Sequence, residues 1–154
     1  MPPQPKRFCK QIDLERALGG AAILAQLSDK NGTGNIDAEF VSFVLDAGSM
    51  DIASYIQKAV DIASLQEPYQ LSLVFKTADA CAWRAWLRGS YGQGIPQHVQ
   101  AAYDLAIAWA KDVGDRAATL GTTPKPALDP PAKLLDYDPQ GSGVSIRGFK
   151  KGFR

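Results

Sequence analysis

The segment PYQLSLVFKTADACAWRAWLRG, residues 68–89, is the most informative part of the sequence for the fold. Its apolar residues recur every three or four positions, the spacing of one face of an α-helix; they are Leu71, Phe75, Ala78, Ala82, Ala85 and Trp86. Leu73, Val74, Ala80, Cys81 and Trp83 make other faces apolar as well. Because a helix that is apolar on several sides is usually buried, we expect a central helix from Pro68 to about Leu87, closed by Gly89.

Four further helical segments are expected around this central helix. Three precede it: Gln11 to Leu18, Ala21 to Leu27, and a long helix that Asp37 caps and that runs to about Val60. One follows it, from Pro96 to about Ala118. Gly48 lies inside the long helix, where a glycine costs about 1 kcal/mol, so it predicts a bend or a close contact with another backbone. No segment alternates apolar and polar residues long enough to force a sheet, and the predicted fold class is all-α.

Prolines divide the chain into three parts. Of the ten, three lie at positions 2, 3 and 5, and five lie between Pro124 and Pro139. Pro68 and Pro96 are each expected in the first turn of a helix, where the missing N–H costs nothing. We therefore expect an N-terminal arm (1–7), a compact bundle of about four to five helices (8–118) and an extended Pro/Gly-rich C-terminal tail (119–154).

The overall charge is close to neutral but unevenly distributed. The formal net charge is +1, which does not make the whole protein attractive to nucleic acid or anionic lipid. The last fifteen residues contain four of the 17 basic residues and none of the 16 acidic ones, so the remainder holds 13 bases against 16 acids. Only Cys9 and Cys81 carry thiols, without a CxxC or Cys/His pattern, and we interpret both as free thiols in a reducing compartment. The sequence has no apolar run typical of a signal peptide or a membrane span, and no membrane partner is expected.

The basic tail is the first candidate site. Its apolar residues cannot build a core of their own, so they stay disordered or order against a partner. The expected partner-binding residues are Val144, Ile146, Arg147, Phe149, Lys150, Lys151, Phe153 and Arg154. The tail could insert as an extended strand between subunits of a partner ring. It could instead contact DNA phosphates in a salt-dependent manner, or remain a solvated end.

The turn from Asp29 to Asp37 is the second candidate, because it resembles the start of an EF-hand loop. Oxygen-bearing side chains fall at loop positions 1, 3, 5 and 9, which makes Asp29, Asn31, Thr33 and Asp37 a weak calcium candidate. Position 12, normally the bidentate glutamate, is Phe40. A tight turn followed by a helix cap needs the same residue types, and we favour that interpretation, so no metal site is predicted.

Enzyme chemistry has no support in the sequence. The chain lacks nucleotide-binding, zinc-protease and serine-hydrolase motifs. His98 is the only histidine, has no nucleophile or carboxylate pair at a suitable spacing, and is expected on the surface. Trp83, Trp86 and Trp109 are expected in the core, although a tryptophan can also mark a subunit contact. We predict a protein that is not an enzyme and uses no cofactor.

Three segments together resemble the head–tail connector, or adaptor, proteins of tailed bacteriophages. They are DLERALGGAAILAQLSDKNGTGNIDAEFVSFVLDAGSMDIASYI (13–56), LSLVFKTADACAWRAWLRG (71–89) and VQAAYDLAIAWAKDVGDRAATLG (99–121), the last with the Tyr103 and Trp109 spacing of the final family helix. The resemblance covers roughly Ile12 to Gly121, and it rests on the ordered set because none of the three segments is diagnostic alone. The long Pro/Gly tail departs from the shortest members.

The resemblance implies a non-enzymatic virion protein, made in the host cytoplasm and located in the neck between capsid and tail. Members form a twelve-subunit ring that docks under the portal protein and meets tail or stopper proteins, and their C-terminal segments tend to reach into the portal. The alternatives are a small DNA-binding or regulatory protein that uses its basic tail, and a calcium-responsive helical module. Contact with packaged DNA is a further expectation for the tail.

Overall fold

A computed structural model of the chain describes residues 6–30, 32–90, 92–116 and 120. These residues form α1 (Gln11–Leu18), α2 (Ala21–Ser28), α3 (Ala38–Ile56), the short 3₁₀ turn η1 (Ile62–Ser64), α4 (Leu71–Gly89) and α5 (Gln97–Gly114). The described residues contain no strand, which confirms the all-α fold class. None of the described helices is both long enough and apolar enough to cross a membrane.

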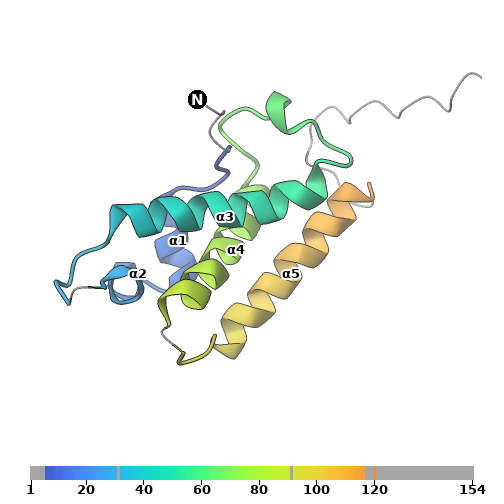
Figure 1. Ribbon diagram of the computed structural model, residues 1–154. Helices are drawn as coiled ribbons and strands as arrows, with labels where there is room; N and C mark the ends of the chain where they lie inside the picture. Colours follow the sequence, from blue (N-terminus) through green and yellow to red (C-terminus); the bar gives the residue numbers. More distant parts are fainter. Residues whose placement is uncertain (1–5, 31, 91, 117–119, 121–154) are drawn as a thin grey trace, which may run out of the picture.

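The central position of α4 organises the bundle, as residues 68–89 predict. Helix α4 packs against α1, α2, α3 and α5, and Figure 1 shows α3 crossing α4 while α5 runs alongside it. One side of α4, with Cys81 and Ala85, closes a core cluster with α1, α2 and the first half of α3. Another side, with Leu73 and Ala80, closes a second cluster with α5 and the second half of α3. Both clusters therefore depend on this one helix.

Local capping explains where the early helices begin and end. Gly19 follows α1 with a φ of 90°, a left-handed conformation that glycine adopts without steric cost. Asp37 precedes α3, and its carboxylate accepts hydrogen bonds from the backbone N–H groups of Glu39 and Phe40. Both features match the expectations from the sequence, because caps depend on residues within one turn of the helix end.

Gly48 provides the close approach that its position inside α3 predicts. A Cβ atom added at Gly48 would lie 2.7 Å from the backbone nitrogen of Cys81 and 2.8 Å from its Cα atom. Real Cβ contacts are almost never this short, so only glycine allows α3 and α4 to cross here. Gly89, the last residue of α4, is used in the same way, because its added Cβ would lie 2.9 Å from the Cβ atom of Leu27 in α2.

Four expected helix boundaries are wrong. Helix α4 begins at Leu71 rather than Pro68. The residue before it, Gln70, has an extended backbone, and Tyr69 packs edge-on against Phe8 with ring centroids 5.6 Å apart. Helix α3 ends at Ile56 rather than near Val60, and Val60 is buried beyond the end of the helix. Pro96 is the residue before α5 rather than part of its first turn. Helix α5 also ends early, at Gly114 rather than near Ala118, and the described residues Asp115 and Arg116 form a turn.

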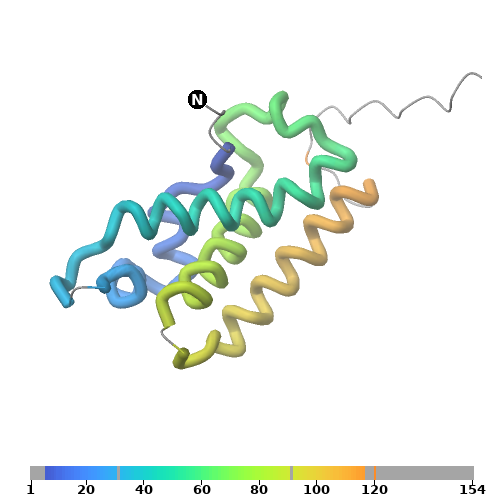
Figure 2. The backbone as a smooth tube through the Cα atoms, viewed as in Figure 1, coloured from blue at the N-terminus to red at the C-terminus, as the bar shows by residue number. Residues whose placement is uncertain are grey.

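The N-terminal segment (residues 6–10) is attached to the bundle. The Lys6 ammonium donates hydrogen bonds to the carbonyl groups of Ile62, Ala63 and Leu65 in the connection between α3 and α4. Figure 2 shows this segment beside that connection. Arg7 reaches Asp46 on α3, with a shortest separation of 2.6 Å. The last two residues of the predicted arm therefore contact the helical domain.

Candidate self-association surfaces

The turn before α3 does not present an open set of metal ligands. The Asp29 carboxylate accepts hydrogen bonds from the Thr33 hydroxyl and the backbone N–H of Gly34, so it faces its own loop. The Asp37 carboxylate already accepts the hydrogen bonds that cap α3. Asn31 lies outside the described residues. Across the part of the chain that the structure describes, no group of three or more His, Cys, Asp or Glu residues could hold a metal ion.

The predicted tail site lies wholly outside the described residues: Val144, Ile146, Arg147, Phe149, Lys150, Lys151, Phe153 and Arg154 fall in 121–154. Its role remains a prediction. His98 lies exposed in the first turn of α5, as expected.

The three tryptophans are half-buried rather than fully enclosed in the core. The Trp83 indole N–H donates a hydrogen bond to the Gln100 side chain at 2.8 Å, and its ring stacks on Tyr103 at a centroid distance of 4.3 Å. Trp86 packs against the first core cluster and Trp109 against the second. Trp83 therefore joins α4 to α5, and its partners account for its position without a subunit contact.

The outer side of α3 carries a stripe that is apolar except for Ser54 and that we call the α3 stripe: Phe43, Ala47, Met50 and Ser54. These residues are spaced by three or four positions, so they line up along one side of the helix. Phe43 is 46% exposed and Met50 is 59% exposed. Contiguous exposed apolar side chains are a feature of protein interaction sites, which makes the α3 stripe a candidate contact surface.

Polar contacts hold the α3 stripe against α4. The Arg88 guanidinium lies over the Phe43 ring at 3.9 Å from its centroid, a cation–π arrangement. One turn earlier on α4, Arg84 donates two hydrogen bonds to the Asp51 carboxylate at 2.6 and 2.7 Å. Such two-point pairs fix orientation as well as distance, and the bond to Asp51 raises the pKa of Arg84. Two contacts with α4, Arg88 with Phe43 and Arg84 with Asp51, therefore fix the position of α3 and of its stripe.

A second exposed apolar surface, which we call the groove face, lies along α1 and the start of α4. It consists of Ile12, Leu71 and Phe75, which are 50%, 67% and 52% exposed. Ile12 and Leu71 line a groove of about 710 Å³ that also includes the N-terminal segment and the Val41 side of α3. Phe75 follows Leu71 by one helical turn and lines a smaller hollow beside α1. The groove face is thus hollowed, whereas the residues of the α3 stripe line neither of these two hollows.

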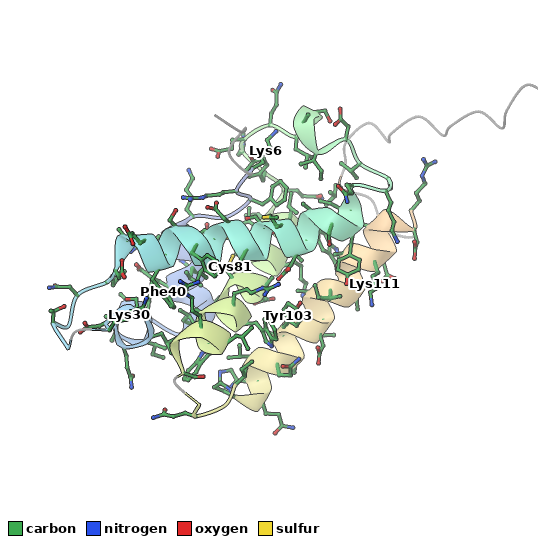
Figure 3. The ribbon with its side chains drawn as sticks, in the orientation of Figure 1. Lys6, Lys30, Phe40, Cys81, Tyr103 and Lys111 are labelled. Atoms are coloured by element: carbon green, nitrogen blue, oxygen red, sulfur yellow. The ribbon has the colours of Figure 1, made fainter. Side chains whose placement is uncertain are left out.

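The two surfaces face different directions. On α3 the groove is lined by Val41 and Leu45, which stand two residues before and two residues after Phe43. Because each residue turns an α-helix by about 100°, these side chains lie on the opposite side of α3 from Phe43. Val41 and Leu45 are buried whereas Phe43 is exposed. Figure 3 shows the side chains on the face of the molecule that carries α3. The α3 stripe and the groove face therefore lie on different sides of the molecule.

Ion pairs surround the groove face without giving it a dominant charge. Lys10 pairs with Glu67 at 3.8 Å and Arg16 with Asp13 at 3.8 Å, both near Ile12. Partial burial raises the pKa of Asp79, which lines the hollow with Phe75, although nearby Lys76 opposes the shift. A near-neutral apolar surface is compatible with close packing of identical chains, because it avoids repulsion between like charges.

Comparisons with known proteins found no matching family model, no matching curated protein and no matching solved structure.

Sequence reasoning did not identify either surface. It assigned Leu71 and Phe75 to the buried stripe of the central helix, and this is wrong because α1 and α2 cover only part of that side of α4. A signal was nevertheless present on α3, whose apolar residues are too numerous for one buried face. The surplus includes Phe43 and Met50, and it could have indicated a second contact surface.

Proposed function

We propose that this protein is a head–tail adaptor of a tailed bacteriophage, a structural and non-enzymatic component of the virion neck. In this proposal copies of the helical domain form a ring through head-to-tail contacts. The ring docks on the portal protein and receives the tail or stopper proteins. The proposal combines the resemblance of residues 12–121 to this family with the two apolar surfaces of the bundle.

The observation that supports ring formation most directly is the pair of dissimilar apolar surfaces on one subunit. A closed ring needs a heterologous interface, in which one surface of a subunit meets a different surface of the next. The α3 stripe exposes Phe43 and Met50, and the groove face is hollowed beside Ile12 and Leu71. Side chains of the stripe that enter the groove would bury apolar area on both partners, which is the main driving force for association.

The basic tail has a separate role in this proposal. Residues 140–154 carry four positive charges and no negative one. We assign them to fastening the ring to the portal, with Ile146, Phe149 and Phe153 filling pockets on that partner. Ring contacts through helices and portal contacts through the tail can then be disrupted independently.

The test of ring formation is a double variant in the α3 stripe, Phe43→Ser with Met50→Ser. Both side chains are exposed, so the monomer should keep its fold, while the ring with portal protein from the same genome should be lost. Co-sedimentation and negative-stain microscopy would measure assembly, and circular dichroism would check the fold. The matched control is Leu105→Ser, which removes a 64% exposed leucine from α5 outside both surfaces and should leave assembly unchanged.

Two outcomes would contradict different parts of the proposal. Rings that form equally well with the double variant would show that the α3 stripe is not the interface. A wild-type protein that never co-sediments with portal protein, but shifts DNA in a salt-dependent gel assay, would replace the adaptor function with the DNA-binding alternative. Deletion of residues 140–154 should weaken portal attachment while the helical content stays constant.

A further inference from the structure

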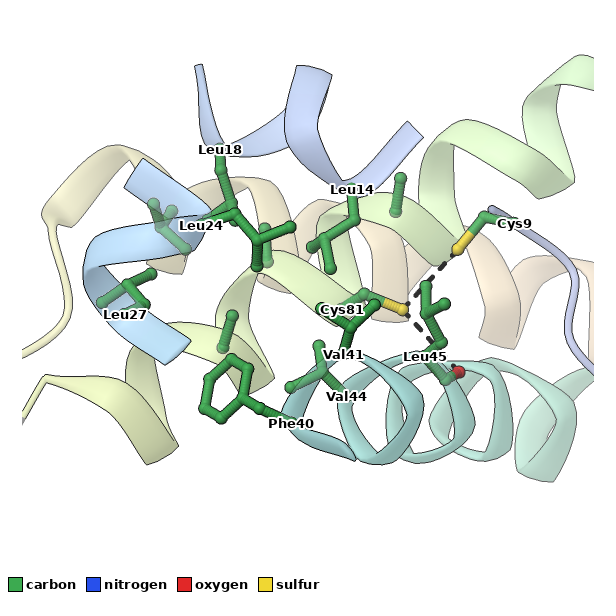
Figure 4. Packing of buried hydrophobic residues seen from close by; sticks show 14 residues of the cluster. Cys9, Leu14, Leu18, Leu24, Leu27, Phe40, Val41, Val44, Leu45 and Cys81 are labelled. Atoms are coloured by element: carbon green, nitrogen blue, oxygen red, sulfur yellow. Dashed lines mark hydrogen bonds between the residues drawn. The ribbon is translucent and has the colours of Figure 1, made fainter. Parts of the chain in front are cut away.

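The two cysteines of the chain meet in the core although 71 residues separate them. The Sγ atoms of Cys9 and Cys81 lie 3.7 Å apart, and both residues are buried. Figure 4 shows this contact, together with the weak hydrogen bond at 3.9 Å between the Cys81 thiol and the Leu45 carbonyl. A disulfide has sulfurs about 2.05 Å apart, so the two atoms need to approach by less than about 2 Å to bond.

The surrounding residues hold both sulfurs in place. The backbone N–H of Phe8, next to Cys9, donates a hydrogen bond to the Ser49 hydroxyl, and the Phe8 ring is buried. On the other side, Gly48 lets the α4 backbone at Cys81 come within contact distance of α3. The N-terminal segment and the helix crossing therefore converge on the same point, which keeps the thiols facing each other.

The two thiols differ in their access to reagents. Cys9 lines the groove of about 710 Å³, whereas Cys81 does not line it and is fully enclosed. The hydrogen bond with Cys9, followed by burial, raises the pKa of the Cys81 thiol well above its usual value. Cys9 is thus the thiol that a reagent in solution meets first.

We propose that Cys9 and Cys81 form a reversible disulfide latch that fastens the N-terminal segment to α4 when the protein meets a small-molecule disulfide such as oxidised glutathione. A local opening of residues 6–10 exposes Cys9, and its thiolate attacks one sulfur of oxidised glutathione. This step forms a mixed disulfide and releases one glutathione thiolate. The Cys81 thiol then gives its proton to water or buffer, its sulfur attacks the Cys9 sulfur, and the second glutathione leaves. Two protein thiols are oxidised and one glutathione disulfide is reduced to two thiols.

The latch has a predictable effect on stability and does not rest on the adaptor function. It would close a loop from residue 9 to residue 81 and so restrict the unfolded chain. A loop of this length should raise the melting temperature by about 10 °C. In a reducing cytoplasm both cysteines would remain thiols, and the disulfide would form only after release into an oxidising medium.

The experiment incubates the full-length protein with oxidised glutathione at about pH 8, where exchange is fast. We expect intact mass to fall by two hydrogens, a monomer on non-reducing gels, no reactive thiol after denaturation, and a higher melting temperature that dithiothreitol reverses. The Cys9→Ser variant should show no change in mass or melting temperature, because Cys81 alone is enclosed. The Cys81→Ser variant should stop at the mixed glutathione disulfide on Cys9.

Other outcomes overturn the latch. A wild-type protein that accumulates the mixed disulfide, forms disulfide-linked dimers, or keeps both thiols after prolonged oxidation does not form the Cys9–Cys81 bond. If either serine variant fails to fold, peptide mapping of the oxidised wild-type protein decides, because a Cys9–Cys81 linked peptide pair must be present. The two proposals are tested separately. Absence of the Cys9–Cys81 disulfide would not contradict ring assembly, and absence of ring assembly would not contradict the mass change that reports the disulfide.

Discussion

The inner and outer sides of α3 use the same kinds of residue for different purposes. On the inner side, Ile52 is fully buried and Gly48 touches the α4 backbone. On the outer side, Phe43 and Met50 are just as apolar but about half exposed. The inner side is filled by this chain, whereas the outer side is left uncovered by the described residues, and we propose that a second molecule covers it. Apolar character therefore does not by itself show whether a side chain serves folding or association.

The largest expected effect comes from comparing Ile52 on the inner side with Met50 on the outer side. Ile52→Ala should lower the free energy of unfolding by about 4 kcal/mol, because it removes a fully buried side chain and leaves a cavity. Met50→Ala should change it by less than about 0.5 kcal/mol, because the side chain is already in water. Urea denaturation followed by circular dichroism measures both. Equal losses would mean that the two sides of α3 are not distinct in the monomer.

The next effect tests the helix crossing. Gly48→Ala should destabilise the protein by about 3 kcal/mol, because the new Cβ atom would lie 2.7 Å from the Cys81 nitrogen and the backbone would have to move. Ser54→Ala is the matched control on the α3 stripe and should be nearly neutral, since Ser54 is exposed. Thermal unfolding of both variants decides. If the Gly48→Ala variant were as stable as the control, α3 and α4 would be able to move apart at this contact with little loss of stability.

The smallest effect concerns pH at the groove face. Burial raises the pKa of Asp79, so the folded protein holds this proton more tightly than the unfolded chain does. Protonated Asp79 therefore adds to the free energy of unfolding in acid. This contribution is lost as the pH rises from the pKa of Asp79 in the unfolded chain to its higher pKa in the folded protein. Asp79→Asn should be slightly more stable than wild type at pH 7, and the difference should vanish in acid. Melting temperatures at several pH values measure it.

The matched control for this comparison is Asp112→Asn, which removes the same charge from an exposed position on α5. An Asp79→Asn variant that is less stable than wild type at pH 7 would contradict the expected sign. It would show that the attraction between Asp79 and Lys76, 3.9 Å apart, outweighs the cost of burial.

Features that depend on neighbouring residues could be predicted from the amino-acid sequence alone. Helix periodicity predicts α1 to α5, and caps such as Gly19 and Asp37 are recognisable because they satisfy backbone groups within one turn. Gly48 is similarly informative, since a glycine inside a helix needs a compensating contact.

Which apolar side chains remain uncovered, and which distant residues meet, became clear from the packing of the helices. Periodicity identifies Leu71 and Phe75 as apolar positions on one side of α4, but whether α1 and α2 reach far enough to cover them depends on how the helices cross. The meeting of Cys9 and Cys81 likewise depends on the N-terminal segment and on the α3–α4 crossing. Burial is a property of the assembled helices, because covering a surface requires residues that lie far away in the chain.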